Sequence, residues 1–136
     1  MVLSDFVGKK YKLESNENFD DYMKALGINF FGRKIAGAVV PVVQLSKEGD
    51  TYTITSGNAV KTFVISFKIG EAFDHETPDG RKVKSTIMLE GEDTLMEDQE
   101  GGGKSIKIVR EFSPAELKMT MTLDSVVCTR IFKLVE

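Results

Sequence analysis

Hydrophobic and polar positions follow a helical spacing only near the start of the chain. Four apolar residues recur at the i, i+3, i+4 and i+7 positions of one helix face: Phe19, Tyr22, Met23 and Leu26. Asn18 stands just before them and can cap the helix with its side chain, and Gly27 is a natural stop. We therefore predict a first helix that begins after Asn18 and ends near Gly27.

A second helix is predicted from about Asn29 to Ala38, and Pro41 excludes its continuation. Gly32 and Gly37 lie inside it, and each costs about 1 kcal/mol relative to Ala in a helix interior. This helix should therefore depend on packing against the rest of the protein. Together the two helices form a predicted helical lid over about residues 16–38.

Beyond residue 40 the pattern changes to short segments separated by turn residues. Glycine-containing turns follow one another at short intervals, for example at residues 48–50, 91–93 and 101–103. This rhythm is typical of an antiparallel meander. One further strand is predicted before the helices, over about residues 6–14. A long meander avoids exposed edges by closing on itself, so we predict a β-barrel with the helical pair as its lid.

Composition narrows the class of protein. The chain has 136 residues, which suits a single domain over residues 1–136, and its net charge of −3 argues against nucleic acid as a partner. Cys128 is the only cysteine, which fits a reducing compartment, and His75 is the only histidine, which argues against zinc. The first residues lack the features of a signal peptide. We expect a cytoplasmic protein that could also enter the nucleus.

Two arginines share inward faces with apolar residues in the last predicted strands. Arg110 alternates in phase with Ile108, and Arg130 alternates in phase with Cys128 and Phe132. An enclosed arginine keeps its charge, and an unpaired buried charge costs several kcal/mol. Each of these arginines therefore needs an anion or ordered water, and the flat guanidinium group matches a carboxylate.

The strand between them presents Met119 and Met121 on its inner face, and methionine adapts to irregular apolar shapes. A carboxylate with a long apolar tail is a fatty acid, which is the ligand that this interior predicts. Two alternatives stay open at this stage. Each arginine could instead be a structural residue paired with an internal Asp or Glu, or the assumed alternation could be off by one residue.

Sequence motifs are spread along the chain. Residues 11–13 read Tyr-Lys-Leu, and residues 18–23 read Asn-Phe-Asp-Asp-Tyr-Met. Later segments add to them: Ile65-Ser66-Phe67-Lys68, Asp79-Gly80-Arg81-Lys82-Val83-Lys84-Ser85, Val109-Arg110-Glu111-Phe112 and Cys128-Thr129-Arg130. With these motifs, essentially the whole chain resembles the cytosolic fatty-acid-binding proteins of the intracellular lipid-binding family, in the heart, adipocyte and insect-muscle branch. The resemblance implies a lipocalin-like, ten-stranded antiparallel up-and-down β-barrel capped by a helix-turn-helix.

The resemblance also implies a binding site. In heart-type and adipocyte-type members, two arginines and a tyrosine near the C-terminus hold the ligand carboxylate. Arg110 and Arg130 match the arginines, but Phe132 stands at the tyrosine position and cannot donate a hydroxyl hydrogen bond. We therefore expect Arg130 to hold the carboxylate, with Arg110 acting largely through water. The expected cavity-lining residues are Phe19, Tyr22, Met23, Ile28, Ala36, Pro41, Ile108, Met119, Met121 and Cys128.

The portal of the family lies between the second helix and two nearby turns. By resemblance, these turns are residues 57–60 and 77–80 of this chain. Val60, Pro78 and Asp79 are accordingly the residues predicted at the portal.

Lys24, Arg33 and Lys34 form a basic group on the predicted lid. This group is either a solvated face or a surface that meets anionic membranes during ligand delivery, where each cation is worth about 1 kcal/mol. In some relatives, similar lid residues serve as a nuclear signal.

The expected function is binding and transport of a long-chain fatty acid by a monomer without a cofactor. Retinoic acid or another hydrophobic acid is the alternative ligand, and delivery to a nuclear receptor could accompany transport. Retinol-binding members carry glutamine where the two arginines stand, so an acid is favoured over an alcohol. We expect no catalytic or metal site, because no catalytic triad or metal-ligand cluster is evident. His75 is interpreted as structural or solvated, and residues 101–105 as a hairpin turn.

Overall fold

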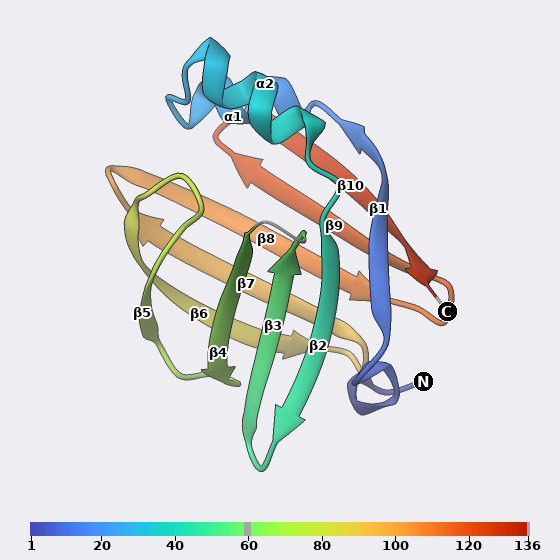
Figure 1. Ribbon diagram of the computed structural model, residues 1–136. Coiled ribbons are helices and arrows are strands. Elements are labelled where there is room, and N and C mark those ends of the chain that lie inside the picture. Colours follow the sequence, from blue (N-terminus) through green and yellow to red (C-terminus); the bar gives the residue numbers. More distant parts are fainter. Residues whose placement is uncertain (59–60, 136) are drawn as a thin grey trace.

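Ten antiparallel strands form a single sheet that curls into a nearly closed barrel (Figure 1). The computed structural model describes residues 1–58 and 61–135 of the chain. The strands are β1 (Lys10–Glu17), β2 (Val42–Glu48), β3 (Thr51–Gly57), β4 (Thr62–Lys68), β5 (Phe73–Glu76), β6 (Lys82–Glu90), β7 (Thr94–Gly101), β8 (Lys104–Phe112), β9 (Glu116–Leu123) and β10 (Val126–Val135).

The order of strands in the sheet is β4-β3-β2-β1-β10-β9-β8-β7-β6-β5. Except for β4 and β5, consecutive strands lie side by side. A short turn joins β9 and β10, where Leu123 pairs with Val126 and Asp124 adopts a φ of 53°. Pairing of β1 with β10 joins the two ends of the chain, and β4 and β5 form the two edges of the sheet. The predicted ten-stranded up-and-down barrel is confirmed.

Two short helices cover one end of the barrel (Figure 1). α1 spans Phe19–Ala25 and α2 spans Phe30–Ala38. The Asn29 side chain accepts a hydrogen bond from the Gly32 N–H at 2.8 Å and caps α2, which begins close to the predicted start near Asn29. Gly27 follows α1 with a φ of +86°, a conformation that favours glycine. Throughout the described ranges, the helices are too short or too polar to cross a membrane.

Three expectations about residues 1–18 are wrong. Residues Leu3–Phe6 form a 3-10 helix, η1, which lies at the end of the barrel opposite the lid (Figure 1), and β1 begins only at Lys10. Phe6 is buried in the apolar core and is not part of a strand. β1 then runs to residue 17, so the helical lid begins at residue 19 and not near residue 16. Asn18 precedes α1 but does not cap it with its side chain: its φ of 62° differs from the extended backbone that is typical of a cap. Its Nδ2 instead donates to the Val127 carbonyl of β10 at 3.2 Å.

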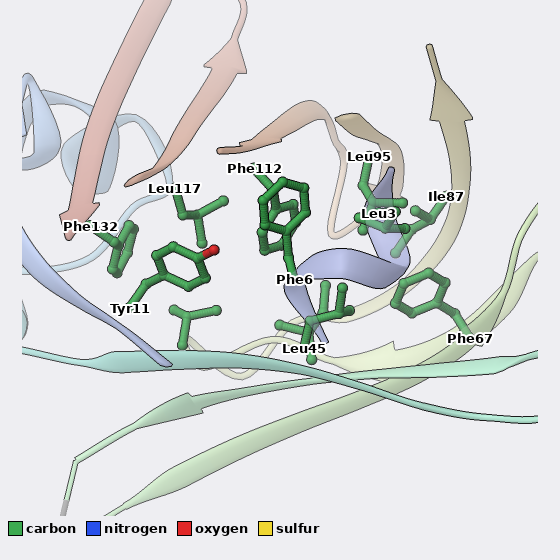
Figure 2. Packing of buried hydrophobic residues seen from close by; sticks show 12 residues of the cluster. Leu3, Phe6, Tyr11, Leu45, Phe67, Ile87, Leu95, Phe112, Leu117 and Phe132 are labelled. Carbon is green, nitrogen blue, oxygen red and sulfur yellow. The ribbon is translucent and has the colours of Figure 1, made fainter. Parts of the chain in front are cut away.

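Buried apolar side chains gather in two clusters. The larger one surrounds η1, where the rings of Phe6 and Tyr11 each lie 5.9 Å from the ring of Phe112 (Figure 2). Burying each such side chain stabilises the fold by about 1.5–3 kcal/mol. The smaller cluster contains Tyr22 of α1 and lies beneath the lid: Tyr22, Ile106, Ile108, Met121, Leu123 and Cys128.

Candidate functional site

Arg110 lies on the inner face of β8, as its alternation with Ile108 predicts, and it is 7% exposed. Its Nη1 donates to Glu97 Oε1 of β7 at 2.7 Å, and the side chain of Glu97 is 1% exposed. Arg110 therefore has a carboxylate partner within the barrel. This is the structural pairing that the sequence left open as an alternative, and a role for Arg110 in ligand binding stays a prediction.

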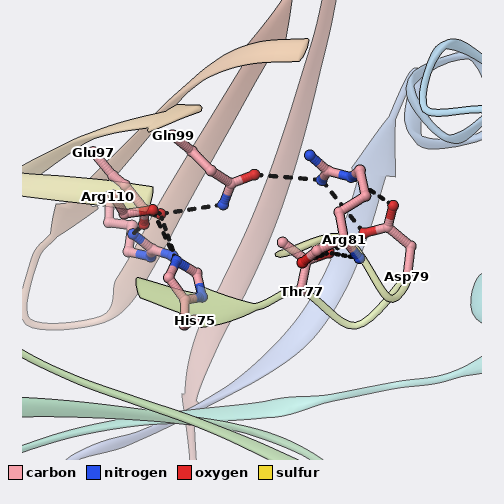
Figure 3. Close-up of polar contacts among 8 residues, drawn as sticks. His75, Thr77, Asp79, Arg81, Glu97, Gln99 and Arg110 are labelled. Atoms are coloured by element: carbon pink, nitrogen blue, oxygen red, sulfur yellow. Dashed lines mark hydrogen bonds and ion pairs between the residues drawn. The ribbon is translucent and has the colours of Figure 1, made fainter. Parts of the chain in front are cut away.

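Glu97 is surrounded by further donors (Figure 3). Its Oε2 accepts hydrogen bonds from Ser85 Oγ at 2.7 Å and from Gln99 Nε2 at 3.2 Å. Burial raises the pKa of Glu97, but the charge of Arg110 and these hydrogen bonds together hold that pKa below its ordinary value. The carboxylate is therefore ionised and neutralises Arg110.

His75 lies on β5 beside this carboxylate (Figure 3). Its Nε2 is 2.8 Å from Ser85 Oγ and 3.8 Å from Glu97 Oε2, and its ring stacks on Phe73 with 4.9 Å between centroids. Burial lowers the pKa of His75, and the negative charge of Glu97 opposes this effect. His75 is thus a partly buried member of the polar group around Glu97.

Arg130 lies on the inner face of β10, near the lid. A β-bulge between Leu13 and Ser15 shifts the alternation of β1, so that Asn16 pairs with Arg130. Arg130 Nε donates to Asn16 Oδ1 at 2.8 Å. The bulge therefore brings an amide, which carries no charge, to the guanidinium group.

The guanidinium of Arg130 is held between aromatic rings. Its carbon atom lies 4.0 Å from the ring centroid of Phe19 in α1 and 5.7 Å from that of Phe132. Within residues 1–58 and 61–135, no carboxylate forms an ion pair with Arg130. Burial lowers the pKa of Arg130 to about 10, and the Cys128 thiol acts in the opposite direction. Arg130 is accordingly an internal cation that lacks a counter-ion in the described chain.

Phe132, at the position of the family tyrosine, is 1% exposed and packs within the larger apolar cluster. The predicted cavity-lining residues fall into two groups. Several belong to the cluster beneath the lid: Phe19, Tyr22, Ile108, Met119, Met121 and Cys128. Outside it, Met23 is buried, and Ile28, Ala36 and Pro41 are partly buried. Their contact with a ligand stays a prediction.

Hydrogen bonds hold the turn over residues 77–80, which is one of the two predicted portal turns. Asp79 accepts from Thr77 Oγ1 at 2.6 Å and from Arg81 Nε at 2.7 Å, and Pro78 is exposed between them. Burial raises the pKa of Asp79, but the bonds from Arg81 and Thr77 outweigh it and keep that pKa below its ordinary value. Val60, the third predicted portal residue, lies outside the described residues.

The three lid cations occupy different environments. Arg33 is 15% exposed, and its Nε donates to Asp20 Oδ1 at 3.0 Å while its Nη1 donates to the Ile28 carbonyl at 2.9 Å. Lys24 lies 3.7 Å from Asp20, and both it and Lys34 are exposed. Arg33 therefore ties α1 to α2, and Lys24 and Lys34 are the cations that a partner could reach.

Ser85, Glu97 and Gln99 are buried polar residues that the sequence reasoning missed. A signal was present in β7, where Leu95, Glu97 and Gln99 share one face. Met96 on the opposite face is also apolar, so polarity alone did not show which face of this strand points inward. The packing of the barrel shows that the face with Leu95, Glu97 and Gln99 points inward.

The fold is a lidded β-barrel, and its inner face carries an arginine that has no carboxylate partner among residues 1–58 and 61–135. The chain belongs to the Lipocalin / cytosolic fatty-acid binding protein family, which residues 7–135 match. It is 45% identical to the muscle fatty acid-binding protein of Schistocerca gregaria, over 97% of this chain and 98% of that protein.

Solved structures agree with this assignment. A fatty acid-binding protein from brain tissue of Drosophila melanogaster is 51% identical and has a TM-score of 0.88, covering 94% of this chain and 98% of that one. A Schistosoma mansoni fatty acid binding protein, solved in complex with arachidonic acid, is 34% identical with a TM-score of 0.93 and covers 100% of both chains.

Proposed function

We propose that the protein binds and transports a long-chain fatty acid, with the acyl chain inside the barrel and the carboxylate on Arg130. The observation that carries this proposal is the partly buried guanidinium of Arg130, which has aromatic rings and an amide around it but no carboxylate among the described residues. A fatty acid carboxylate supplies the missing charge, and charge-assisted hydrogen bonds of this kind contribute about 1.5–3 kcal/mol. The names of the relatives support the same ligand class.

Arg110 has a secondary part in this proposal. Its charge is already neutralised by Glu97, so a ligand carboxylate gains little by replacing one anion with another. Arg110 therefore acts on the ligand through water and chiefly keeps Glu97 ionised. This proposal keeps the arrangement expected from the sequence, in which Arg130 holds the carboxylate and Arg110 acts largely through water.

The acyl chain is expected to lie against the apolar cluster beneath the lid, where Met119 and Met121 adapt to its shape. Calorimetric titration of the delipidated protein with oleate and with retinoic acid tests the ligand class. Oleate should bind and should displace retinoic acid. If neither acid binds, or if retinoic acid binds more tightly and oleate fails to compete, the fatty acid proposal is wrong. Mass spectrometry of lipid extracted from the purified protein gives an independent identification.

Delivery to anionic membranes is a further part of the proposed function. The exposed side of α2 carries Phe30, Phe31 and Ile35, which are 62%, 79% and 67% exposed, next to Lys34. Apolar residues beside cations suit the surface of an anionic bilayer. We place the protein in the cytoplasm as a monomer without catalytic activity, and a nuclear receptor is a second destination for the ligand.

A further inference from the structure

A continuous row of polar side chains crosses the inner wall of the barrel from β5 to β8 (Figure 3). His75 contacts Ser85, Ser85 and Gln99 donate to Glu97, and Arg81 Nη2 donates to Gln99 Oε1 at 3.3 Å. Ser85, Glu97 and Gln99 are each at most 5% exposed. The row is separate from Arg130, which lies on β10.

Two buried nitrogen atoms of this row have no hydrogen-bond partner in the described residues: His75 Nδ1 and Arg81 Nη1. Buried polar atoms nearly always have a partner, so each such atom calls for an explanation. The other donors of Arg81 are engaged by Asp79 and Gln99, which fixes the guanidinium and leaves Nη1 free to donate.

The hydrogen bonds determine what His75 can offer. The ionised Glu97 only accepts, so Ser85 must donate its hydroxyl hydrogen to Glu97 Oε2. Ser85 Oγ then accepts from His75, so the proton of the neutral imidazole is on Nε2. His75 Nδ1 is therefore an acceptor and Arg81 Nη1 is a cationic donor. A hydroxyl group can satisfy either atom, because it both donates and accepts.

The row lies away from Arg130, the residue to which we assign the carboxylate. Arg110 and Arg130 both pair with Met119, so β8 and β10 are two strands apart, roughly 9.5 Å. From Arg110 the row extends further away from Arg130, through β7 and β6 to β5. With the carboxylate on Arg130, as proposed above, only the hydrocarbon part of the acid can approach the polar row.

We propose that this wall recognises a hydroxyl group on the hydrocarbon chain, so that the protein carries hydroxylated long-chain fatty acids. The inference rests on the proposed function, because it takes the carboxylate to be on Arg130. A plain acyl chain leaves His75 Nδ1 and Arg81 Nη1 without a partner from the ligand, whereas a hydroxyl at a matching carbon pairs with one of them. The position of the hydroxyl along the chain is then the property that the wall selects.

Calorimetric titration of the delipidated protein with stearate and with 9-, 10- and 12-hydroxystearate tests this inference. These probes differ only in one hydroxyl and its position. At least one hydroxystearate should bind as tightly as stearate or more tightly. In His75→Phe, which keeps a ring to stack on Phe73, or in Arg81→Met, the same acid should lose about tenfold relative to stearate. Lys84→Met, on the exposed face of β6, is the matched control and should leave the ratio unchanged.

Each outcome has a distinct meaning. If every hydroxystearate binds the unaltered protein about tenfold more weakly than stearate, the row holds only water and the inference is overturned. The same conclusion follows if neither His75→Phe nor Arg81→Met changes the ratio. If stearate itself does not bind, the proposed function fails first. The ligand series on the unaltered protein decides the matter even when a variant does not fold.

Discussion

The guanidinium carbon of Arg130 lies 4.0 Å from the ring centroid of Phe19, so a residue of the barrel wall contacts the lid helix α1 directly. The cation that we assign to the ligand carboxylate is therefore also a support for the lid. A carboxylate that binds Arg130 competes with, or adds to, this contact. Arg130 is therefore shared between the proposed carboxylate site and the contact that holds α1.

Replacing Arg130 with Gln should reduce the affinity for oleate by about ten- to a hundredfold, because the charge-assisted bonds to the carboxylate are lost. Titration calorimetry measures the loss. Lys118→Gln removes a cation from an exposed position on β9 and should leave the affinity unchanged. Equal affinities in Arg130→Gln and the unaltered protein would show that the carboxylate binds elsewhere.

Replacing Arg110 with Met should destabilise the protein by about 3–5 kcal/mol, because Glu97 then stays buried without its partner. The double variant Glu97→Leu/Arg110→Met removes both charges and should recover most of this loss. Urea unfolding measures both free energies. The double variant should also lose less oleate affinity than Arg130→Gln does. A loss of equal size would place Arg110 on the carboxylate beside Arg130.

Stability should fall as the pH drops below about 6.5. The folded protein holds the pKa of His75 below the value near 6.5 of an unfolded chain, so the unfolded state binds more protons in this window. The lowered pKa of Glu97 acts in the same direction at lower pH, since its stabilisation is lost as the carboxylate becomes protonated.

His75→Phe should flatten the upper part of this profile, below pH 6.5, and leave the lower part caused by Glu97. Because the chain has one histidine, this variant removes every histidine titration at once. Urea unfolding at a series of pH values gives the two curves. Parallel curves for His75→Phe and the unaltered protein would assign the pH dependence to other groups.

Phe132→Tyr should bind oleate more tightly, by about tenfold, because the hydroxyl adds a hydrogen bond to a carboxylate on Arg130. Phe132 lies close enough for this, with 5.7 Å between its ring centroid and the guanidinium carbon. Calorimetry on the two proteins compares the affinities, and urea unfolding checks the effect of the buried hydroxyl on stability. An unchanged affinity means that the hydroxyl is irrelevant in this barrel.

Lys24→Gln/Lys34→Gln should slow the transfer of a fluorescent fatty acid to anionic vesicles and leave transfer to neutral vesicles unchanged. Arg33 is excluded from this variant because it joins the two helices through Asp20 and the Ile28 carbonyl. Lys107→Gln/Lys118→Gln removes the same charge from exposed wall positions. If the lid variant and the wall variant transfer the fatty acid at the same rate, the net charge of the protein controls the transfer rate, and the position of the cations on the lid does not.

The sequence by itself determined the features that depend on local order. The alternation of polar and apolar residues showed that Arg110 points inward, turn spacing predicted the meander, and the second helix was expected to begin near Asn29. These signals are local because a strand repeats every two residues and a cap involves neighbours along the chain. The resemblance to a family added the number of strands, and it predicts that Arg130 belongs to the binding site.

Tertiary structure alone decided which charges are paired. Glu97 neutralises Arg110 only because β7 lies beside β8 in one register. The bulge in β1 brings Asn16 to Arg130, which has no carboxylate partner in the part of the chain that the structure describes. Likewise, Asn18 was predicted to cap a helix with its side chain, but that side chain contacts β10 instead. An ion pair between strands depends on register and burial across the sheet, and neither is encoded in the alternation of a single strand.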